Sequence, residues 1–433
     1  MTAGYRVAPV PEVRGRIRVP GDKSISHRTL MLGGIASGRT DVTGFLASAD
    51  CLATLEAQRR MGVQVEQLSP TQLRVHGAGA RGLTAPNGEL DMGNAGTAIR
   101  LFMGLLAGQP FESTLTGDAS LRRRPMERVA APLRLMGAQI DTVEGKPPVR
   151  IRPVQKLRAI DYALPMASAQ VKSAVLLAAL RAEGTTRVAE PAPTRDHTER
   201  MLEGFGVQLR REAGQVWLAG GQSLTAAPID VPGDFSSAAF FIVAGAIAGA
   251  ADFTIENVGV NPTRTGLLDI LRLMGADIRV HPRAGAGAEP VADIEVRASG
   301  LRGIQVPEHL VPLAIDEFPV LFVAAACAEG ETLVTGAEEL RVKESDRLAV
   351  MAEGLTRLGI VNELRPDGIR IQGGRFRGGS VDSHGDHRIA MSFAIASLRC
   401  DGEIRIEDVE NVGTSFPGFV EVAHAAGLKV QGA

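Results

Sequence analysis

The 433-residue chain is poor in aromatic side chains. They make up 4% of it, with one tryptophan and two tyrosines, whereas glycine occurs 50 times. This composition indicates thin, repetitive packing with many tight connections, and it does not fit one large aromatic core. Because the length exceeds the size at which a single core usually stops growing, we expect two domains.

Cysteine is also scarce. Cys51, Cys327 and Cys400 are an odd number, and their spacing is not that of metal ligands. We expect three free, buried thiols in a protein of a reducing compartment.

The chain also lacks an apolar run of membrane length and a large net charge. The longest apolar run, 238–251, has 14 residues, fewer than the ~20 that span a bilayer. The N-terminus lacks the apolar core of a secretory signal. The net charge of -2 gives no general reason to expect nucleic acid or an anionic membrane as a partner. We therefore expect a cytoplasmic protein in which any anion binding is local.

One short phrase is present six times, in which an apolar residue and a glycine follow a helix-period segment and precede a strand-like run. The glycines are Gly62, Gly137, Gly206, Gly275, Gly359 and Gly427, spaced 68 to 84 residues apart. Glycine just past a helix often takes the left-handed conformation, so each phrase predicts a helix-to-strand junction. A nearly all-apolar segment, typical of a buried helix, lies upstream of each phrase. The chain is therefore predicted to repeat one α/β unit six times.

A second repeat divides these units into three and three. The segment VPGD at 19–22 precedes the first unit and returns at 231–234 before the fourth. We predict two homologous domains, one formed by residues 19–233 and the other by 1–18 together with 234–433. The N-terminal segment would add a strand to the second domain. The two chain crossings, near residues 19 and 232, are expected to form a hinge.

Basic residues gather where the predicted buried helices begin. They lie in the segments GDKSISHR, GNAGTAIR, RRRPM, SAQVKS, TRDHTER, RVKESDR and GDHR. Helix N-termini favour anions because their first amides lack partners within the helix. Lys23, Arg100 and Arg388 lie beside or within apolar helices, where an unpaired charge is costly. They need anionic partners. A protein partner could supply them, but with so many cations a multiply charged ligand is the more economical source.

Two acids stand among these bases. Asp316 lies at the start of the fifth buried helix, and Glu344 lies within RVKESDR. A site that only holds anions gains nothing from carboxylates, whereas proton transfer needs them. Salt bridges to neighbouring arginines are the alternative interpretation.

Two other segments resemble a phosphate-binding loop and a metal site, but each lacks a required residue. VPGDKS resembles a phosphate-binding loop but lacks the glycine directly before the lysine. His384, Asp386 and His387 could be read as metal ligands, yet no further His or Cys cluster completes the set, so we expect no metal.

The segments VPGDKSISHR, GNAGTAIR, RRRPM, SAQVKSA, DEFPV, RVKESDR and GDHRIAM closely resemble those of the 5-enolpyruvylshikimate-3-phosphate (EPSP) synthase family, in this order and over essentially the whole chain. The resemblance implies a two-domain inside-out α/β barrel built from six βαβαββ repeats. It implies transfer of the enolpyruvyl group of phosphoenolpyruvate to the 5-hydroxyl of shikimate 3-phosphate, through a tetrahedral addition-elimination intermediate. Phosphate is released, and the reaction belongs to the shikimate pathway of aromatic amino-acid biosynthesis. No metal or organic cofactor, nucleic acid or membrane is implied, and we expect a monomer.

The resemblance also assigns residues to the two substrates. Shikimate 3-phosphate would be bound by Lys23, Ser24, Arg28, Ser168, Ala169, Gln170, Arg195, Asp316 and Lys343. Phosphoenolpyruvate would be bound by Lys23, Asn94, Gly96, Arg124, Gln170, Arg347 and Arg388. Asp316 would take the hydroxyl proton. Lys23 and Glu344 would exchange protons at the substrate, and either one could protonate C3.

Some positions depart from the common pattern. Thr414 stands where many relatives have lysine, and Ala169 replaces the second serine of an SSQ motif. Arg195 looks like the substitute for a tyrosine that some members place against the shikimate ring. These features resemble the second of the family's two sequence classes. Gly96 is the residue of members sensitive to the inhibitor glyphosate, whereas Leu101 replaces a proline often found there.

The sequence leaves two other functions open. The sister enzyme that transfers enolpyruvate to UDP-N-acetylglucosamine shares the fold, but it typically uses a reactive cysteine or aspartate in a mobile loop. None of the three cysteines lies in a charged, glycine-bearing loop suited to thiolate activation. A non-catalytic receptor for phosphorylated metabolites is the other alternative. Asp316 and Glu344 disfavour it, because a site that only binds anions gains nothing from carboxylates.

Overall fold

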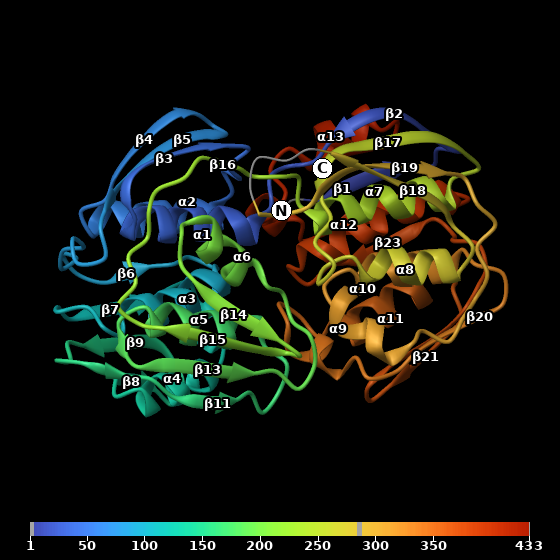
Figure 1. Cartoon of the computed structure of the whole chain (residues 1–433). Coiled ribbons are helices and arrows are strands. Elements are labelled where there is room, and N and C mark those ends of the chain that lie inside the picture. Colours follow the sequence, from blue (N-terminus) through green and yellow to red (C-terminus); the bar gives the residue numbers. More distant parts are fainter. Residues whose placement is uncertain (1–3, 284–287, 433) are drawn as a thin grey trace. The chain divides into compact units, whose positions relative to one another are not determined.

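The computed structural model describes residues 4–283 and 288–432, which form two compact units (Figure 1). The N-terminal unit consists of residues 21–231 with Ala288 and Glu289. The C-terminal unit consists of residues 4–20, 232–283 and 290–432. Both units are mixtures of helices and sheets. No helix within the described residues is long and apolar enough to cross a membrane.

Three buried helices form the centre of the N-terminal unit. They are α1 (Lys23–Ile35), α3 (Gly96–Leu106) and α5 (Ala169–Ala179). Small residues let them pack closely, as at Gly104 of α3, where an added Cβ would lie 2.1 Å from the carbonyl oxygen of Ala174. Beside them lie α2 (Ala49–Arg60), α4 (Glu127–Leu135), α6 (His197–Gly204) and the short η1 (Leu121–Arg123).

Sheets surround these helices within residues 21–231. One has the order β16 (Ile229–Asp230), β3 (Ser37–Thr43), β5 (Gln72–Ala78) and β4 (Gln64–Ser69). The next has the order β6 (Leu90–Asp91), β7 (Ser113–Thr116), β9 (Lys146–Arg152) and β8 (Gln139–Val143). The third has the order β11 (Asp161–Ala163), β13 (Thr185–Ala189), β15 (Gln215–Ala219) and β14 (Leu209–Glu212), and β10 (Leu157–Arg158) pairs with β12 (Ala182–Glu183).

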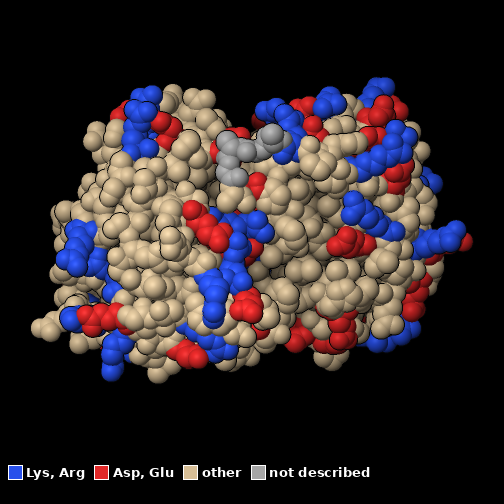
Figure 2. All heavy atoms as spheres, viewed as in Figure 1, with Lys and Arg blue, Asp and Glu red and all other residues tan. Residues whose placement is uncertain are grey.

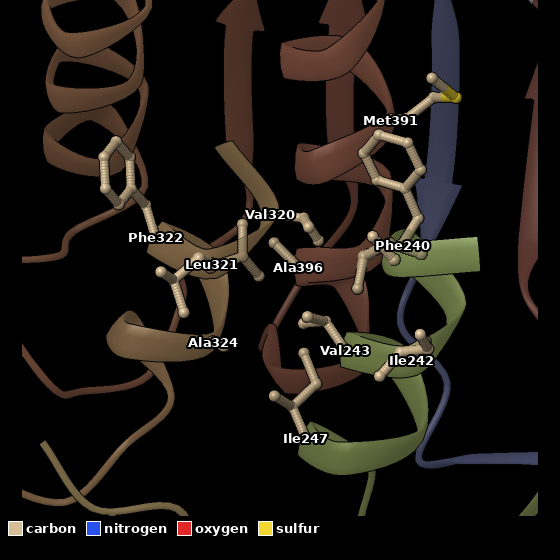
Figure 3. Packing of buried hydrophobic residues seen from close by; sticks show 14 of the residues in the cluster. Phe240, Ile242, Val243, Ile247, Val320, Leu321, Phe322, Ala324, Met391 and Ala396 are labelled. Carbon is tan, nitrogen blue, oxygen red and sulfur yellow. The ribbon is translucent and has the colours of Figure 1, made fainter. Parts of the chain in front are cut away.

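The C-terminal unit has the same plan. Its buried helices are α7 (Phe235–Ile247), α10 (Phe318–Ala326) and α12 (His387–Ala396), whose side chains, such as Val243, Val320 and Ala396, meet in one core (Figure 3). Around them lie α8 (Gly266–Leu273), α9 (Val311–Ala314), α11 (Arg347–Arg357) and α13 (Phe419–Ala425). The short helices are η2 (Glu308–Leu310), η3 (Glu338–Val342), η4 (Ser397–Arg399) and η5 (Glu410–Thr414).

The described strands of this unit also form sheets. One has the order β18 (Asp277–Arg283), β19 (Val291–Arg297), β17 (Ala250–Gly259) and β2 (Glu12–Arg18). A second has the order β20 (Glu331–Val334), β22 (Gly368–Gln372) and β21 (Asn362–Arg365). The third has the order β23 (Gly379–Asp382), β24 (Ile404–Glu407), β1 (Tyr5–Ala8) and β25 (Lys429–Gly432).

Strands that are far apart in the chain pair in two of these sheets. β1 lies between β24 and β25, so that Val7 is opposite both Ile404 and Val430. β2 runs parallel to β17. In each four-stranded sheet named above, one edge strand is parallel to its neighbour and the other pairs are antiparallel.

The six repeated glycine phrases are helix-to-strand junctions, as the sequence predicted. Each follows one of the helices α2, α4, α6, α8, α11 and α13 and precedes a strand. The six glycines have φ between 82° and 97°. A side chain is disfavoured there because this left-handed region is strained for residues other than glycine.

The two VPGD segments share a helix cap. Asp22 before α1 and Asp234 before α7 have nearly the same backbone conformation, with φ/ψ of -61°/123° and -66°/123°. Asp22 accepts a hydrogen bond from the Ile25 amide at 2.8 Å, and Asp234 accepts one from the Ser236 amide at 2.7 Å. The repeated aspartate therefore serves the start of each first buried helix.

The surface carries charges of both signs close together (Figure 2). Many of them pair within one sheet or hairpin, such as Arg150 with Glu112 and Arg283 with Asp293. This mixed surface is in keeping with the small net charge of the chain.

Candidate active site

Lys23 and Ser24 begin α1. The Lys23 ammonium donates to Asp50 Oδ2 at 2.9 Å, and Asp50 lies in the first turn of α2. The sequence predicted that a cation at this helix start needs an anionic partner, and part of that need is met by a carboxylate of the protein itself. Asp50 was not among the residues singled out in the sequence, because it is 27 residues away along the chain.

Arg28 is buried one turn further along α1. Its guanidinium donates to the Thr198 hydroxyl at 2.7 Å, the Ser173 hydroxyl at 3.0 Å and the Ser24 carbonyl oxygen at 3.0 Å. Ser173 lies on α5 and Thr198 on α6. The hydroxyls of two other helices therefore fix the direction of this arginine.

Asn94, Gly96 and Arg124 are brought together at the start of α3. Arg124 donates to Asn94 Oδ1 at 2.7 Å, and Asn94 donates in turn to Asp118 at 2.8 Å. A Cβ at position 96 would lie 2.9 Å from Arg124 Nη1. The glycine thus lets the guanidinium approach the helix start, and any side chain there has to displace it.

Ser168 and Gln170 stand at the start of α5. Ser168 caps the helix and accepts from the Val171 amide at 3.4 Å, while Ala169 beside it is half-buried. Gln170 Oε1 accepts from Arg100 at 2.8 Å. Arg100, noticed in the sequence as a buried cation, therefore orients the Gln170 amide.

Arg195 lies half-buried just before α6. Lys172, on α5, has a different role from the one that its position suggested. The sequence grouped Lys172 with the anion-binding bases. In the structure its ammonium donates to Glu190 at 2.8 Å and lies 2.6 Å from Glu199, and its side chain is 1% exposed. Although burial acts to lower the pKa of Lys172, Glu199 and Glu190 raise it above its usual range. Lys172 is thus a structural cation.

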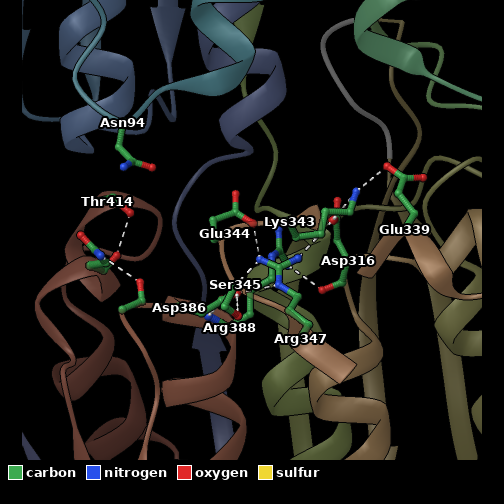
Figure 4. Close-up of polar contacts among 12 residues, drawn as sticks. Asn94, Asp316, Glu339, Lys343, Glu344, Ser345, Arg347, Asp386, Arg388 and Thr414 are labelled. Carbon is green, nitrogen blue, oxygen red and sulfur yellow. Dashed lines mark hydrogen bonds and ion pairs between the residues drawn. The ribbon is translucent and has the colours of Figure 1, made fainter. Parts of the chain in front are cut away.

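In the C-terminal unit, Asp316 lies between α9 and α10 and faces two cations (Figure 4). Asp316 Oδ1 is 3.8 Å from the Lys343 ammonium and 3.5 Å from Arg347 Nη1. Lys343 also donates to Glu339 at 2.8 Å. Burial lowers the pKa of Lys343, and the charge of Arg347 lowers it further, although Glu339 acts in the opposite direction.

Arg347 is the most enclosed cation of this group, with its side chain 1% exposed. It donates to Asp386 Oδ2 at 2.7 Å through Nε and to Glu344 Oε2 at 2.7 Å through Nη2. Its Nη1 makes no hydrogen bond within residues 4–283 and 288–432. Burial acts to lower the pKa of Arg347, but Asp386 and Glu344 hold it above its usual range.

Asp386 was read from the sequence as a possible metal ligand, and its contacts give it another role. It caps α12 by accepting from the Arg388 amide at 2.9 Å, and it accepts from the Ser345 hydroxyl at 3.1 Å. Burial acts to raise the pKa of Asp386, yet Arg347 and His387 hold it below its usual range.

Arg388 follows Asp386 on α12. Its Nη1 donates to the Asp316 carbonyl oxygen at 3.1 Å and lies 3.7 Å from Glu317 Oε1. Burial lowers the pKa of Arg388, and Arg347 lowers it further. Thr414, in η5, donates to the Asn411 carbonyl oxygen at 2.7 Å.

The residues assigned by resemblance thus fall into two sets. Lys23, Ser24, Arg28, Asn94, Gly96, Arg124, Ser168, Ala169, Gln170 and Arg195 belong to the N-terminal unit. Asp316, Lys343, Glu344, Arg347 and Arg388 belong to the C-terminal unit, where they are close together. Each set gathers at the starts of its unit's helices, where backbone amides add to the attraction for anions.

The thiols are unsuited to nucleophilic chemistry. All three cysteines are free, and Cys51 and Cys400 are buried as expected, whereas Cys327 is only half-buried. Burial raises the pKa of Cys327 to about 12 and raises that of Cys51 above its usual range. A thiol with such a pKa stays protonated and is a poor nucleophile.

Residues 7–423 match the family described as EPSP synthase (3-phosphoshikimate 1-carboxyvinyltransferase). The chain belongs to the EPSP synthase family. Its curated relatives include a 3-phosphoshikimate 1-carboxyvinyltransferase of Methylococcus capsulatus, 59% identical over 99% of this chain and 98% of the relative. Another, from Alkalilimnicola ehrlichii, is 61% identical over 98% of this chain and 96% of the relative.

Solved structures agree with this placement. EPSP synthase from Acinetobacter baumannii is 55% identical and superposes with a TM-score of 0.92, covering 100% of both chains. The enolpyruvyl transferase NikO from Streptomyces tendae has a TM-score of 0.79 at 17% identity, covering 100% of this chain and 99% of its own, which shows a shared fold alone.

Membership in the family resolves the functions that the residues alone left open. The activity of the chain is that of a 3-phosphoshikimate 1-carboxyvinyltransferase, a transferase of the shikimate pathway. Neither transfer to UDP-N-acetylglucosamine nor non-catalytic binding of metabolites is favoured.

Proposed function

We propose that the described residues carry out this transfer through one set of contacts to each substrate. Lys23, Ser24, Arg28, Ser168, Ala169, Gln170, Arg195, Asp316 and Lys343 bind shikimate 3-phosphate. Lys23, Asn94, Gly96, Arg124, Gln170, Arg347 and Arg388 bind phosphoenolpyruvate. The observation that supports this most is Arg347 Nη1, a buried donor without a hydrogen bond in the described structure, 3.5 Å from Asp316.

The arginines of this set suit anionic substrates. A guanidinium binds a carboxylate or a phosphate through two parallel hydrogen bonds. Arg124 is anchored by Asn94 and Arg347 by Asp386, so their directions are fixed before the ligand arrives. Such preorganised cations stabilise the charge that develops on the phosphate as it leaves.

Asp316 serves as the base for the first step. It takes the proton of the shikimate 5-hydroxyl while the oxygen attacks C2 of phosphoenolpyruvate and C3 gains a proton. Loss of phosphate and of a C3 proton then gives the enolpyruvyl ether. A general base has to lie within hydrogen-bond reach of the proton that it takes.

Lys23 and Glu344 exchange protons with the substrate. Lys23 donates to Asp50, and the Glu344 carboxylate accepts from Arg347, so each has a partner of opposite charge within its own unit. Either one is placed to protonate C3 in this proposal. Neither step calls for a metal or an organic cofactor, because the cations supply the electrostatic stabilisation.

We also propose the finer description of the fold. Six βαβαββ repeats form an inside-out barrel, in two domains made of residues 19–233 and of 1–18 with 234–433. Support comes from the six glycine junctions and from the two capped VPGD segments. The chain crossings near residues 19 and 232 act as a hinge, and scattering measurements should show a smaller radius of gyration with both substrates bound.

The protein is further proposed to be a cytoplasmic monomer. Its three free cysteines fit a reducing compartment. Sedimentation at several protein concentrations tests the monomer, which predicts one mass throughout.

Phosphate release tests the function directly. We expect release from phosphoenolpyruvate only when shikimate 3-phosphate is added, with one phosphate per enolpyruvyl ether formed. UDP-N-acetylglucosamine is the matched control acceptor and should give none. Turnover with that acceptor, or tight binding of both substrates without turnover, would contradict the proposal.

A further inference from the structure

A buried charged cluster lies next to the catalytic residues of the C-terminal unit. It consists of Ser236 on α7, Arg264 just before α8, and Glu317 at the start of α10, and we call it the Glu317 cluster. The three residues are between 2% and 5% exposed. None of them was assigned a role from the sequence.

Ser236 lies two residues after the second VPGD segment. Counted from the aspartate, it holds the place that Ser24 holds in the first segment. Its hydroxyl donates to Glu317 Oε1 and accepts from Arg264 Nη2, the latter at 2.6 Å. The second segment thus directs its serine into a buried cluster of the protein.

Two carboxylates and two guanidinium groups lie close together in and beside the Glu317 cluster. Arg264 Nη2 lies 3.5 Å from Asp234 Oδ1 and 3.7 Å from Glu317 Oε1. The same Glu317 oxygen lies 3.7 Å from Arg388 Nη1. Glu317 Oε1 therefore stands between the buried guanidinium of Arg264 and the partly buried guanidinium of Arg388, and such groups are costly to bury without a carboxylate.

Arg388 connects the Glu317 cluster to the catalytic base. The nitrogen that faces Glu317 also donates to the Asp316 carbonyl oxygen at 3.1 Å. Glu317 follows Asp316 directly in the chain, so two adjacent residues contact the same nitrogen of Arg388. A guanidinium held at one nitrogen keeps its other nitrogens in a fixed plane for a ligand.

We propose that Glu317, held by Ser236 and Arg264, is a positioning residue that fixes Arg388 for the carboxylate or phosphate of phosphoenolpyruvate. The inference rests on the proposed function, because that function makes Arg388 a phosphoenolpyruvate ligand. Glu317 acts through Arg388 and does not touch the substrate.

Glu317→Gln tests this, because it keeps the shape and removes the charge. We expect KM for phosphoenolpyruvate to rise by about tenfold or more, as on loss of a charge-assisted contact. KM for shikimate 3-phosphate should change by less than about threefold, because Arg388 is not among its proposed ligands. Ser236→Ala should shift KM for phosphoenolpyruvate in the same direction by a smaller factor, and Glu317→Asp should recover part of the loss.

Glu199→Gln is the matched control. Glu199 is a buried carboxylate that contacts Lys172 in the N-terminal unit, whereas Arg388 belongs to the C-terminal unit. This variant should lower the melting temperature and leave KM for phosphoenolpyruvate unchanged. If Glu317→Gln also lowers only the melting temperature, or raises both KM values alike, the positioning role is wrong.

Arg388→Lys separates this inference from the function on which it rests. If Arg388→Lys raises KM for phosphoenolpyruvate and Glu317→Gln does not, the positioning role fails and the ligand assignment stands. If Arg388→Lys itself leaves this KM unchanged, the assignment of Arg388 fails and the inference fails with it.

Discussion

Asp316 Oδ1 lies 3.5 Å from Arg347 Nη1, opposite a guanidinium whose other two nitrogens are taken by Asp386 and Glu344. The contact is an ion pair and is too long for a hydrogen bond. Arg347 Nη1 and the Asp316 carboxylate are therefore neighbours that are not hydrogen-bonded to each other. This arrangement suits a base that must accept a proton beside a cation that must bind an anion.

Asp386→Asn should be strongly destabilising. Asparagine can still cap α12, but the buried Arg347 loses the more deeply buried of its two hydrogen-bonded carboxylates, so we expect a cost of about 3–5 kcal/mol in the free energy of unfolding. Because the pKa of Asp386 is lowered in the folded state, its contribution is present above the unfolded pKa and is lost as the pH falls through the folded one. Calorimetry at neutral and acidic pH should show the difference from wild type shrinking below about pH 4. A constant difference would contradict this account of Asp386.

His27→Asn should change the pH dependence of stability in the N-terminal unit. Burial, followed by the charges of Lys23 and Arg28, lowers the pKa of His27 to about 3. Between about pH 6.5 and pH 3 the unfolded chain therefore binds a proton that the folded chain does not bind. As the pH falls through this range, the free energy of unfolding decreases by about 1.4 kcal/mol for each pH unit. The variant should lack this contribution. Urea unfolding followed by Trp217, the sole tryptophan of the chain and part of the same unit, measures it. If the free energy of unfolding depends on pH equally in the variant and in the wild type, the lowered pKa of His27 is contradicted.

Gly96→Ala should impair phosphoenolpyruvate binding. The added Cβ would stand 2.9 Å from Arg124 Nη1 and 3.3 Å from Arg100 Nη1, so at least one guanidinium has to move. We expect KM for phosphoenolpyruvate to rise about tenfold or more, since small displacements of positioning groups are costly. Gly204→Ala is the matched control, because a Cβ there meets nothing within 4 Å. Similar kinetics for the two variants would show that Gly96 provides no such clearance.

Lys343→Arg should extend activity to higher pH. The pKa of Lys343 is lowered by burial and by Arg347, so the wild-type side chain loses its charge below the usual lysine range of about 10.4. Binding of shikimate 3-phosphate should weaken as the pH rises through that lowered pKa. Arginine remains charged throughout, so the alkaline limb of kcat/KM for shikimate 3-phosphate should move upward. An unchanged alkaline limb would assign it to another group.

Local features of the fold were predictable from the sequence. The six glycine junctions and the two aspartate caps depend on residues within a few positions of one another. Glycine after a helix and aspartate before one each have a direct backbone cause. These elements therefore needed no knowledge of the tertiary structure.

The pairing of buried charges was not predictable in the same way. Lys172 looked like an anion-binding residue, and its partners Glu190 and Glu199 are 18 and 27 residues away. Arg28 is fixed by Thr198, 170 residues away. Glu317 stands next to Asp316 in the sequence, but its contact with Ser236 spans 81 residues. Such partners come from helix packing, which residue patterns do not reveal.

The central claim is that Asp316 is the base that takes the proton of the shikimate 5-hydroxyl. Asp316→Ala and Asp316→Asn test it most directly, the second with nearly unchanged shape. Single-turnover kinetics should show kcat reduced by about a hundredfold to ten-thousandfold in both variants. Calorimetric binding should give a Kd for shikimate 3-phosphate within about threefold of wild type. Equal losses in kcat and in binding would contradict the claim and show that Asp316 only positions the ligand.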